Sequence, residues 1–190
     1  ASVPVASGHP GYATTEDDDL MTDNMVFPMA QQLLECLCDA LATNPEPPLD
    51  CCLRSGDQAY ADMSQLANQC CTGMAWVRIS RIFPTTEFPT QTEVWTPCVH
   101  VQFAVELEMG VWRCEPQQDG QHLPTCAEWT DSAQLVANDW EAMVRAACCF
   151  ENLQLPGTPV LMGVWQPLNA GGGCTGGSLP LMVATMNCAC

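Results

Sequence analysis

The stretch that decides the fold is VHVQFAVELEM, at residues 99–109. Large apolar side chains occupy every second position from Val99 to Met109, and polar or small side chains stand between them. Because successive side chains of a strand point to opposite faces, a period of two buries one face and leaves the other polar. The pattern therefore predicts a β-strand that packs one face against a core.

The flanking segments predict three more strands. Residues 74–83 are rich in Trp, Val and Ile and precede a proline-bounded connection, which favours a strand followed by an extended loop. Residues 160–165 and 179–186 have the composition of two further strands, joined by a glycine-rich loop at residues 170–177. Together with the central stretch, these segments predict a four-stranded sheet.

Two amphipathic segments predict helices. From Met25 to Leu41, apolar residues recur at steps of three and four, and Pro45 prevents continuation. A second apolar stripe runs from Trp129 to Cys148. Two helices on one face of a mainly antiparallel sheet would bury both stripes, in the order helix, strand, strand, helix, strand, strand. The expected fold class is therefore α+β.

Composition divides the chain into an arm and a domain. Residues 1–24 mix Ser, Gly, Pro and Thr with an acidic run from Glu16 to Asp19, and too little apolar area is present there to offset the entropy of ordering. We expect a flexible, disordered acidic arm at residues 1–24 and a single α+β domain at residues 25–190. No apolar run approaches the roughly 20 residues that a membrane-spanning helix needs, so no membrane partner is expected.

The charge balance excludes a class of partners. The 190 residues hold 22 carboxylates, five arginines and no lysine, which gives a net charge of −17. Almost the whole surface would repel a phosphate backbone, so specific binding of nucleic acid is not expected. DNA can still pass an acidic wall without binding to it.

The chain has fourteen cysteines, six of them in adjacent pairs, and two interpretations of their role stay open. One of Cys51 or Cys52 with one of Cys70 or Cys71 would close a loop of about 20 residues and stabilise the fold by roughly 3 kcal/mol. The other interpretation is that most cysteines are buried, reduced and small apolar residues. Connectivity cannot be read from spacing alone.

Metal binding and catalysis have weaker support. The thiol pairs at 36/38 and 188/190, with His100 and His122, are candidate zinc ligands, but their spacing differs from that of structural zinc sites. The histidines lie in no hydrolase motif, and no base, nucleophile and oxyanion donor can be assembled. We therefore expect no catalytic residue, no metal and no cofactor.

Loops and tryptophans near strand ends are the expected contact elements. The glycine-rich loop lacks the lysine of a phosphate-binding loop and precedes a strand, so contact with a neighbouring subunit is the stronger hypothesis. Residues 85–96 and the N-terminal arm are further contact candidates, and interfaces favour tryptophan. The candidate interface residues are Trp95, Trp112, Gly171, Gly172, Gly173, Cys174, Gly176 and Gly177.

The order of elements, the acidic surface and the stretch VWQPLNAGGGC at residues 164–174 resemble the tail terminator proteins of long-tailed bacteriophages, particularly those of actinobacterial hosts. The resemblance covers roughly residues 25–186 and is mainly architectural. Its sequence-specific part is the Trp-Gln-Pro and Gly-Gly-Gly-Cys portions of that stretch.

The resemblance implies a structural virion protein, assembled in the host cytoplasm, that does no covalent chemistry. Its homo-hexameric ring would cap the tail tube protein, stop tube polymerisation and join the tail to a head-tail connector or stopper protein, with DNA passing through the lumen. Another neck component, a head-tail stopper or adaptor, shares this ring geometry and stays an alternative. A cysteine-rich metal-binding or extracellular module is the alternative from a different class.

Overall fold

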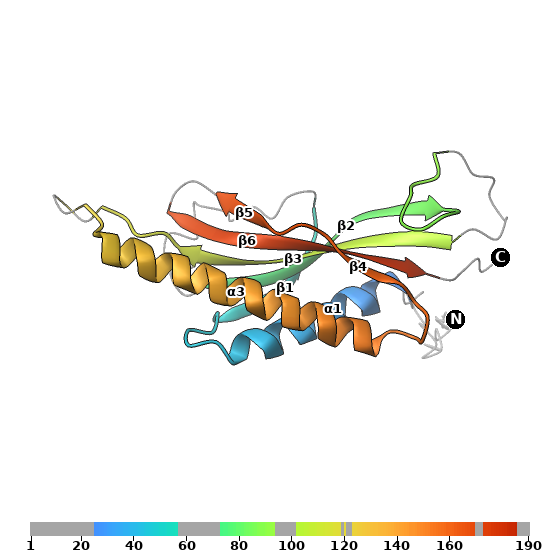
Figure 1. The fold of residues 1–190 in the computed structure, drawn as a ribbon, viewed down its shortest axis with the longest axis horizontal. Coiled ribbons are helices and arrows are strands. Elements are labelled where there is room, and N and C mark those ends of the chain that lie inside the picture. The colour runs from blue at the N-terminus through green and yellow to red at the C-terminus, as the bar shows by residue number, and fades with distance from the viewer. Residues whose placement is uncertain are drawn as a thin grey trace, which may run out of the picture.

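The computed structural model describes residues 25–56, 73–93, 102–118, 120, 123–169 and 173–185. These residues form an α+β fold, as the sequence predicts (Figure 1). The elements in chain order are α1 (Val26–Ala42), β1 (Asp50–Arg54), β2 (Met74–Thr85), β3 (Gln102–Cys114), α3 (Cys126–Leu153), β4 (Val160–Met162), β5 (Gln166–Asn169) and β6 (Cys174–Thr185).

The sheet has six strands, so the expected number of four is wrong, and it is mixed because one of its strand pairs is parallel. The strand order is β1-β2-β3-β6-β4, and β5 also pairs with β6. β1 runs parallel to β2, whereas the other pairs are antiparallel. The strands β1 and β5, with five and four residues, are unexpected, whereas β4 has three residues and lies within the strand predicted at residues 160–165. Segments of that length are too short to show a clear period.

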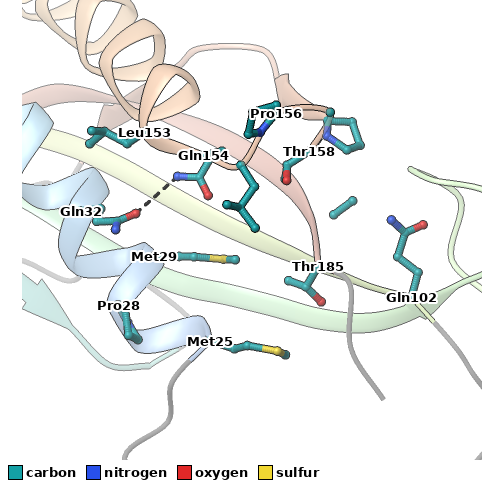
Figure 2. Close-up of a pocket in the computed structure, with 14 residues that line it drawn as sticks. Met25, Pro28, Met29, Gln32, Gln102, Leu153, Gln154, Pro156, Thr158 and Thr185 are labelled. Carbon is teal, nitrogen blue, oxygen red and sulfur yellow. Dashed lines mark hydrogen bonds between the residues drawn. The ribbon is translucent and has the colours of Figure 1, made fainter. Parts of the chain in front are cut away.

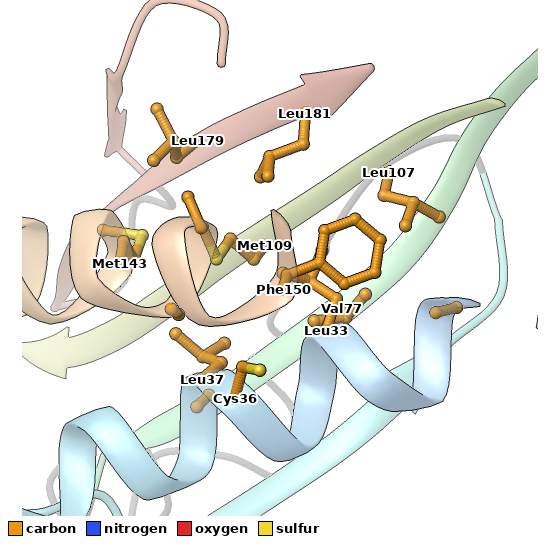
Figure 3. Packing of buried hydrophobic residues seen from close by; sticks show 14 of the residues in the cluster. Leu33, Cys36, Leu37, Val77, Leu107, Met109, Met143, Phe150, Leu179 and Leu181 are labelled. Atoms are coloured by element: carbon orange, nitrogen blue, oxygen red, sulfur yellow. The ribbon is translucent and has the colours of Figure 1, made fainter. Parts of the chain in front are cut away.

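Both helices cover the same face of the sheet (Figure 1). Alternate residues of β2, β3 and β6 meet one stripe of each helix, and Figure 3 shows this packing. Full burial of one such side chain stabilises the fold by roughly 1.5–3 kcal/mol, so this layer is the main source of stability. The fully buried side chains include Leu33, Leu37, Val77, Leu107, Met109, Met143, Phe150, Leu179 and Leu181.

The helix α3 is longer than the core requires. Its buried residues are Asp139, Ala142, Met143, Ala146, Ala147 and Phe150, so burial begins only at the fourteenth of its 28 residues. Residues 126–138 therefore extend past the packed layer, and Figure 1 shows this half reaching one end of the molecule. Neither helix among the described residues is long and apolar enough to cross a membrane.

Candidate functional site

The sheet face away from the helices holds a second, smaller cluster. Trp76, Trp112 and Cys174 are buried there. Cys114 packs against them, and both Cys114 and Cys174 are disulfide-bonded. Trp112 is 3% exposed and Cys174 2%, so two of the expected interface residues are packed inside this subunit.

Glycines in β6 allow this face to pack closely. Because β6 begins at Cys174, Gly176 and Gly177 belong to a strand, and the predicted loop is shorter than expected. A Cβ atom on Gly176 would lie 2.0 Å from the carbonyl oxygen of Val111, and one on Gly177 would lie 2.3 Å from the indole of Trp165. No real Cβ atom approaches so closely, so both positions require glycine.

The structure describes only some of the other residues that are expected to make contacts. Gly173 is partly exposed and has a φ of +89°, a conformation that glycine adopts readily. Trp95, Gly171, Gly172, the N-terminal arm and residues 94–96 lie outside the described residues. Residues 85–93 form a turn in which the Thr85 hydroxyl donates to the carbonyl oxygen of Thr90 at 2.7 Å. The interface role of these residues stays a prediction.

Charged side chains on the same face form ion pairs between β2 and β3. Glu106 bonds Arg81 at 2.8 Å, and Glu108 bonds Arg78. The arginines stand opposite these carboxylates in the strand register, where opposite charges stabilise pairing. Both glutamates are thus engaged in holding the sheet together.

A buried ion pair joins the sheet to α3. Arg113 donates from Nε and Nη2 to the two carboxylate oxygens of Asp139, at 2.7 Å each. Their side chains are 7% and 4% exposed. Asn44, after α1, donates to Asp139 Oδ1 at 3.2 Å and accepts from Arg145 at 3.2 Å. No spacing rule reveals this network, because its members come from three separate elements.

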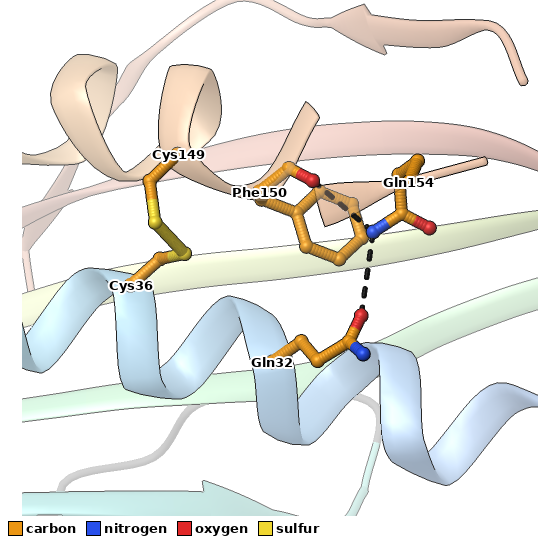
Figure 4. The surroundings of a disulfide bond; sticks show 5 residues. All are labelled: Gln32, Cys36, Cys149, Phe150 and Gln154. Carbon is orange, nitrogen blue, oxygen red and sulfur yellow. Dashed lines mark hydrogen bonds between the residues drawn. A yellow bond between two sulfur atoms is a disulfide. The ribbon is translucent and has the colours of Figure 1, made fainter. Parts of the chain in front are cut away.

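Two disulfides fix α1 to its neighbours. Cys36 is bonded to Cys149 of α3, as Figure 4 shows, and Cys38 is bonded to Cys51 of β1. The Cα–Cα distances are 5.9 and 6.2 Å, within the range that disulfides span. Residues two apart on a helix point about 200° from each other, so the two thiols of α1 reach different elements.

The use of thiols in disulfides is therefore confirmed, but the expected pairing is wrong for Cys51. Its partner is Cys38, because β1 runs beside α1, and Cys52 carries a free thiol. The expected partners Cys70 and Cys71 lie outside the described residues. Sequence separation alone could not choose between partners that only the tertiary fold brings together.

Three thiols among the described residues are free: Cys52, Cys126 and Cys148. Burial raises the pKa of Cys52, Arg54 opposes this effect and Asp50 adds to it. A raised pKa favours the protonated, unreactive thiol. No group of three or more His, Cys, Asp or Glu side chains in the described part of the chain is placed to hold a metal ion. His100, His122 and the thiol pair at 188/190 lie outside it.

From Trp129 to Trp140, α3 exposes an apolar stripe that the sequence predicts as buried. Trp129 and Trp140 are each 45% exposed, and Ala133 between them is also exposed. The core-facing residues, such as Met143 and Phe150, lie on a neighbouring side of the helix. A helical period identifies an apolar stripe, but it cannot tell whether that stripe faces this core or another surface.

A groove opens at the far end of α3, where that helix, the start of α1 and the end of β6 meet (Figure 2). Its volume is about 540 Å³, and none of the fourteen described residues that line it is charged. Met25 and Met29 line one side, and Leu153 and Pro156 the other. Gln154 donates to Gln32 at 3.4 Å across the groove. No sequence signal marks this site.

A capping box starts the exposed half of α3. The backbone N–H of Glu128 donates to the Thr125 hydroxyl at 3.3 Å, and the backbone N–H of Thr125 donates to the Glu128 carboxylate at 2.6 Å. The Thr125 hydroxyl also donates to that carboxylate, at 2.8 Å. The backbone hydrogen bond, followed by the side-chain one, lowers the pKa of Glu128.

Acidification is expected to loosen the first turn of α3. The pKa of Glu128 is lower in the folded chain than its ordinary value of 4.5. The stabilisation that its carboxylate gives to the first turn is therefore complete above pH 4.5 and is lost as the pH falls through the folded pKa. Amide-exchange protection of residues 126–130 should fall over that window in the wild-type chain. Glu128→Ala, which removes the acceptor, should show low protection at every pH, whereas Glu141→Ala, an exposed change on the same helix, should behave as wild type. Equal profiles for all three chains would contradict the prediction.

Comparison with known proteins assigns no family to the chain. No protein-family model matches it, and no curated protein matches it significantly.

Proposed function

We propose that this protein is a structural virion protein of a phage tail or neck, specifically a tail terminator. Six copies form a ring that caps the tail tube, stops its polymerisation and joins the finished tail to the head connector. The observation that carries the proposal is the pair of surfaces that an acidic subunit leaves open, namely the exposed apolar side chains of α3 and the groove, whose described lining is uncharged. Large exposed apolar surfaces on soluble proteins mark sites of association.

The charge of the subunit supports a role around DNA. With a net charge of −17, a ring of these subunits presents carboxylates to its lumen as well as to solvent. A phosphate backbone is repelled by such a wall and slides through without being retained. This property suits a passage for DNA, and it does not suit a protein that grips DNA.

The residues that carry the resemblance have structural roles that support it. The Trp-Gln-Pro portion leads into β5, and the segment from Gly173 onward enters β6, its antiparallel partner. Trp165 packs against Gly177, a position with no room for a side chain. The described parts of that stretch, residues 164–169 and 173–174, therefore serve a backbone arrangement that a shared fold would preserve.

The arrangement of polar groups favours binding over catalysis. Glu106, Glu108 and Asp139 are each held by an arginine, so these carboxylates serve packing between elements. A head-tail stopper or adaptor, which would use the same surfaces in a ring, remains the second candidate.

The proposal is tested by native mass spectrometry of the purified chain, with and without reductant, together with electron microscopy of added tail tubes. The expected result is a metal-free hexamer, or a monomer that becomes a hexamer at tube ends, and tubes that stop growing. A ring that binds the connector and ignores tubes would identify a stopper or adaptor. A strictly monomeric, zinc-loaded protein would overturn the proposal in favour of the cysteine-rich module.

A further inference from the structure

We infer that copies of this chain contact one another head to tail, with the tip of α3 from one copy seated in the groove of the next. The α3 tip is Leu123, Cys126, Trp129 and Ala133, and the terminal groove is the cavity of Figure 2. The inference rests on the proposed ring and names the contact that builds it.

The α3 tip is built to meet another surface. A helix of 28 residues spans about 42 Å, yet its buried residues begin only at Asp139. Leu123 is 73% exposed and Trp129 is 45% exposed. Tryptophan is enriched among the residues that dominate binding energy at interfaces, because it buries a large area with few rotatable bonds. An exposed Trp on a projecting helix is therefore a suitable anchor.

The terminal groove matches that anchor in size and chemistry. Its volume of about 540 Å³ falls within the usual range for sites that enclose a small ligand, about 300–1,000 Å³, so an indole ring fits. Met25 and Met29 supply thioether side chains, which adapt their shape and contact aromatic rings favourably. Gln102 supplies an amide oxygen that can accept the indole N–H.

Charge selects a second copy of the chain as the occupant. With 22 carboxylates and five arginines, two copies repel each other wherever their acidic surfaces meet. The described lining of the groove has no charge and the side chains that define the tip are apolar, so contact between them brings together fewer carboxylates than contact elsewhere, even with the exposed Glu128 and Asp131 beside the tip. Self-association of so acidic a chain is favoured at surfaces of this kind.

The positions of the two surfaces determine the kind of assembly. The tip lies at one end of the long axis, and the groove lies at the other, where α3 ends and β6 ends (Figure 1). A contact between two different surfaces is heterologous, so each copy can bind one neighbour at each end. Repetition of such a contact closes into a ring or continues as a filament, and the proposed function requires the ring.

The inference is tested with one variant at each surface. Trp129→Arg disables the tip and Thr158→Arg fills the groove, whereas Gln134→Arg and Thr86→Arg place the same charge at exposed positions elsewhere. By native mass spectrometry, each surface variant should form at least tenfold fewer rings than its control. Circular dichroism and thermal unfolding should show all four variants folded. Wild-type amounts of ring in both surface variants would overturn the inference.

Mixing the two disabled chains gives the sharpest result. The intact tip of the Thr158→Arg chain can enter the intact groove of the Trp129→Arg chain, but the reverse contact is blocked. The mixture should therefore produce a one-to-one dimer that grows no further. A mixture that stays monomeric would overturn the inference.

A cross-link identifies the occupant directly. Cys126 is a free, exposed thiol at the tip, and Thr158→Cys places a second thiol in the groove. Oxidation should link Cys126 to the groove of another copy, and Cys126→Ser should abolish that link. A groove thiol that instead oxidises with another cysteine of its own chain, and not with Cys126 of a neighbour, would overturn the inference. Linked filaments without hexamers would support the contact between tip and groove and would contradict the proposed ring. Rings that survive Trp129→Arg would support the proposed ring and would contradict the contact between tip and groove.

Discussion

Asp139→Ala is expected to lower the free energy of unfolding by about 3–5 kcal/mol, because it leaves the Arg113 guanidinium buried without a counter-charge. The lost carboxylate also removes the acceptor of the Asn44 side chain, which ties the loop after α1 to α3. Denaturant unfolding under non-reducing conditions measures the loss. A loss of that size is a large fraction of the free energy of unfolding of a typical domain.

Asp131→Ala is the matched control, since Asp131 is an exposed aspartate on the same helix, and its effect should stay within about 0.5 kcal/mol. The double variant Arg113→Met with Asp139→Leu removes both charges and should recover most of the loss, because buried apolar side chains replace the pair at little cost. If Asp139→Ala and Asp131→Ala unfold at the same denaturant concentration, the buried pair contributes nothing and the prediction is wrong.

Removal of the disulfide between α1 and α3 is expected to have the second largest effect. Cys36 and Cys149 are separated by 113 residues in sequence, and a link that closes so long a loop restricts the unfolded chain by roughly 4–5 kcal/mol in the chain-entropy model. The other disulfides already shorten that loop. We therefore expect Cys36→Ala with Cys149→Ala to lower the free energy of unfolding by about 3–4 kcal/mol.

The neighbouring Cys148 supplies the control, because it is exposed and carries a free thiol. Cys148→Ala should leave the denaturation midpoint unchanged, and reductant should destabilise this control but have a smaller effect on the double variant. A double variant as stable as Cys148→Ala would show that the covalent link between the helices is energetically irrelevant.

The long elements of the fold are predictable from the sequence because they carry strong periods. Alternation marks β3, the step of three and four marks α1, and proline or glycine closes several of these elements. The short strands β1 and β5 escape prediction because they acquire their conformation by pairing with β2 and β6, and β4 is shorter than the strand predicted at residues 160–165. Edge pairing of this kind is a tertiary effect that local sequence does not encode.

Candidate sites are harder to predict than elements, and α3 shows why. The helical period correctly predicts the apolar stripe that contains Trp129. The helix extends beyond its own core, however, so the first half of that stripe is exposed. Gly176 and Gly177 show a different error, because their composition suggests a loop but they lie inside a strand. Glycine is needed there because Gly176 lies against the backbone of Val111 and Gly177 lies against Trp165. The terminal groove combines residues from distant segments.

The two disulfides of α1 also provide a path for mechanical load. A pull on α3 passes through the bond between Cys149 and Cys36 to α1, and through the bond between Cys38 and Cys51 to the edge strand β1. Three elements that pack through non-covalent contacts thereby share tension through covalent bonds. Traction between neighbouring copies would then be spread across the helical layer and into the sheet, and the long helix would resist being peeled away from its subunit.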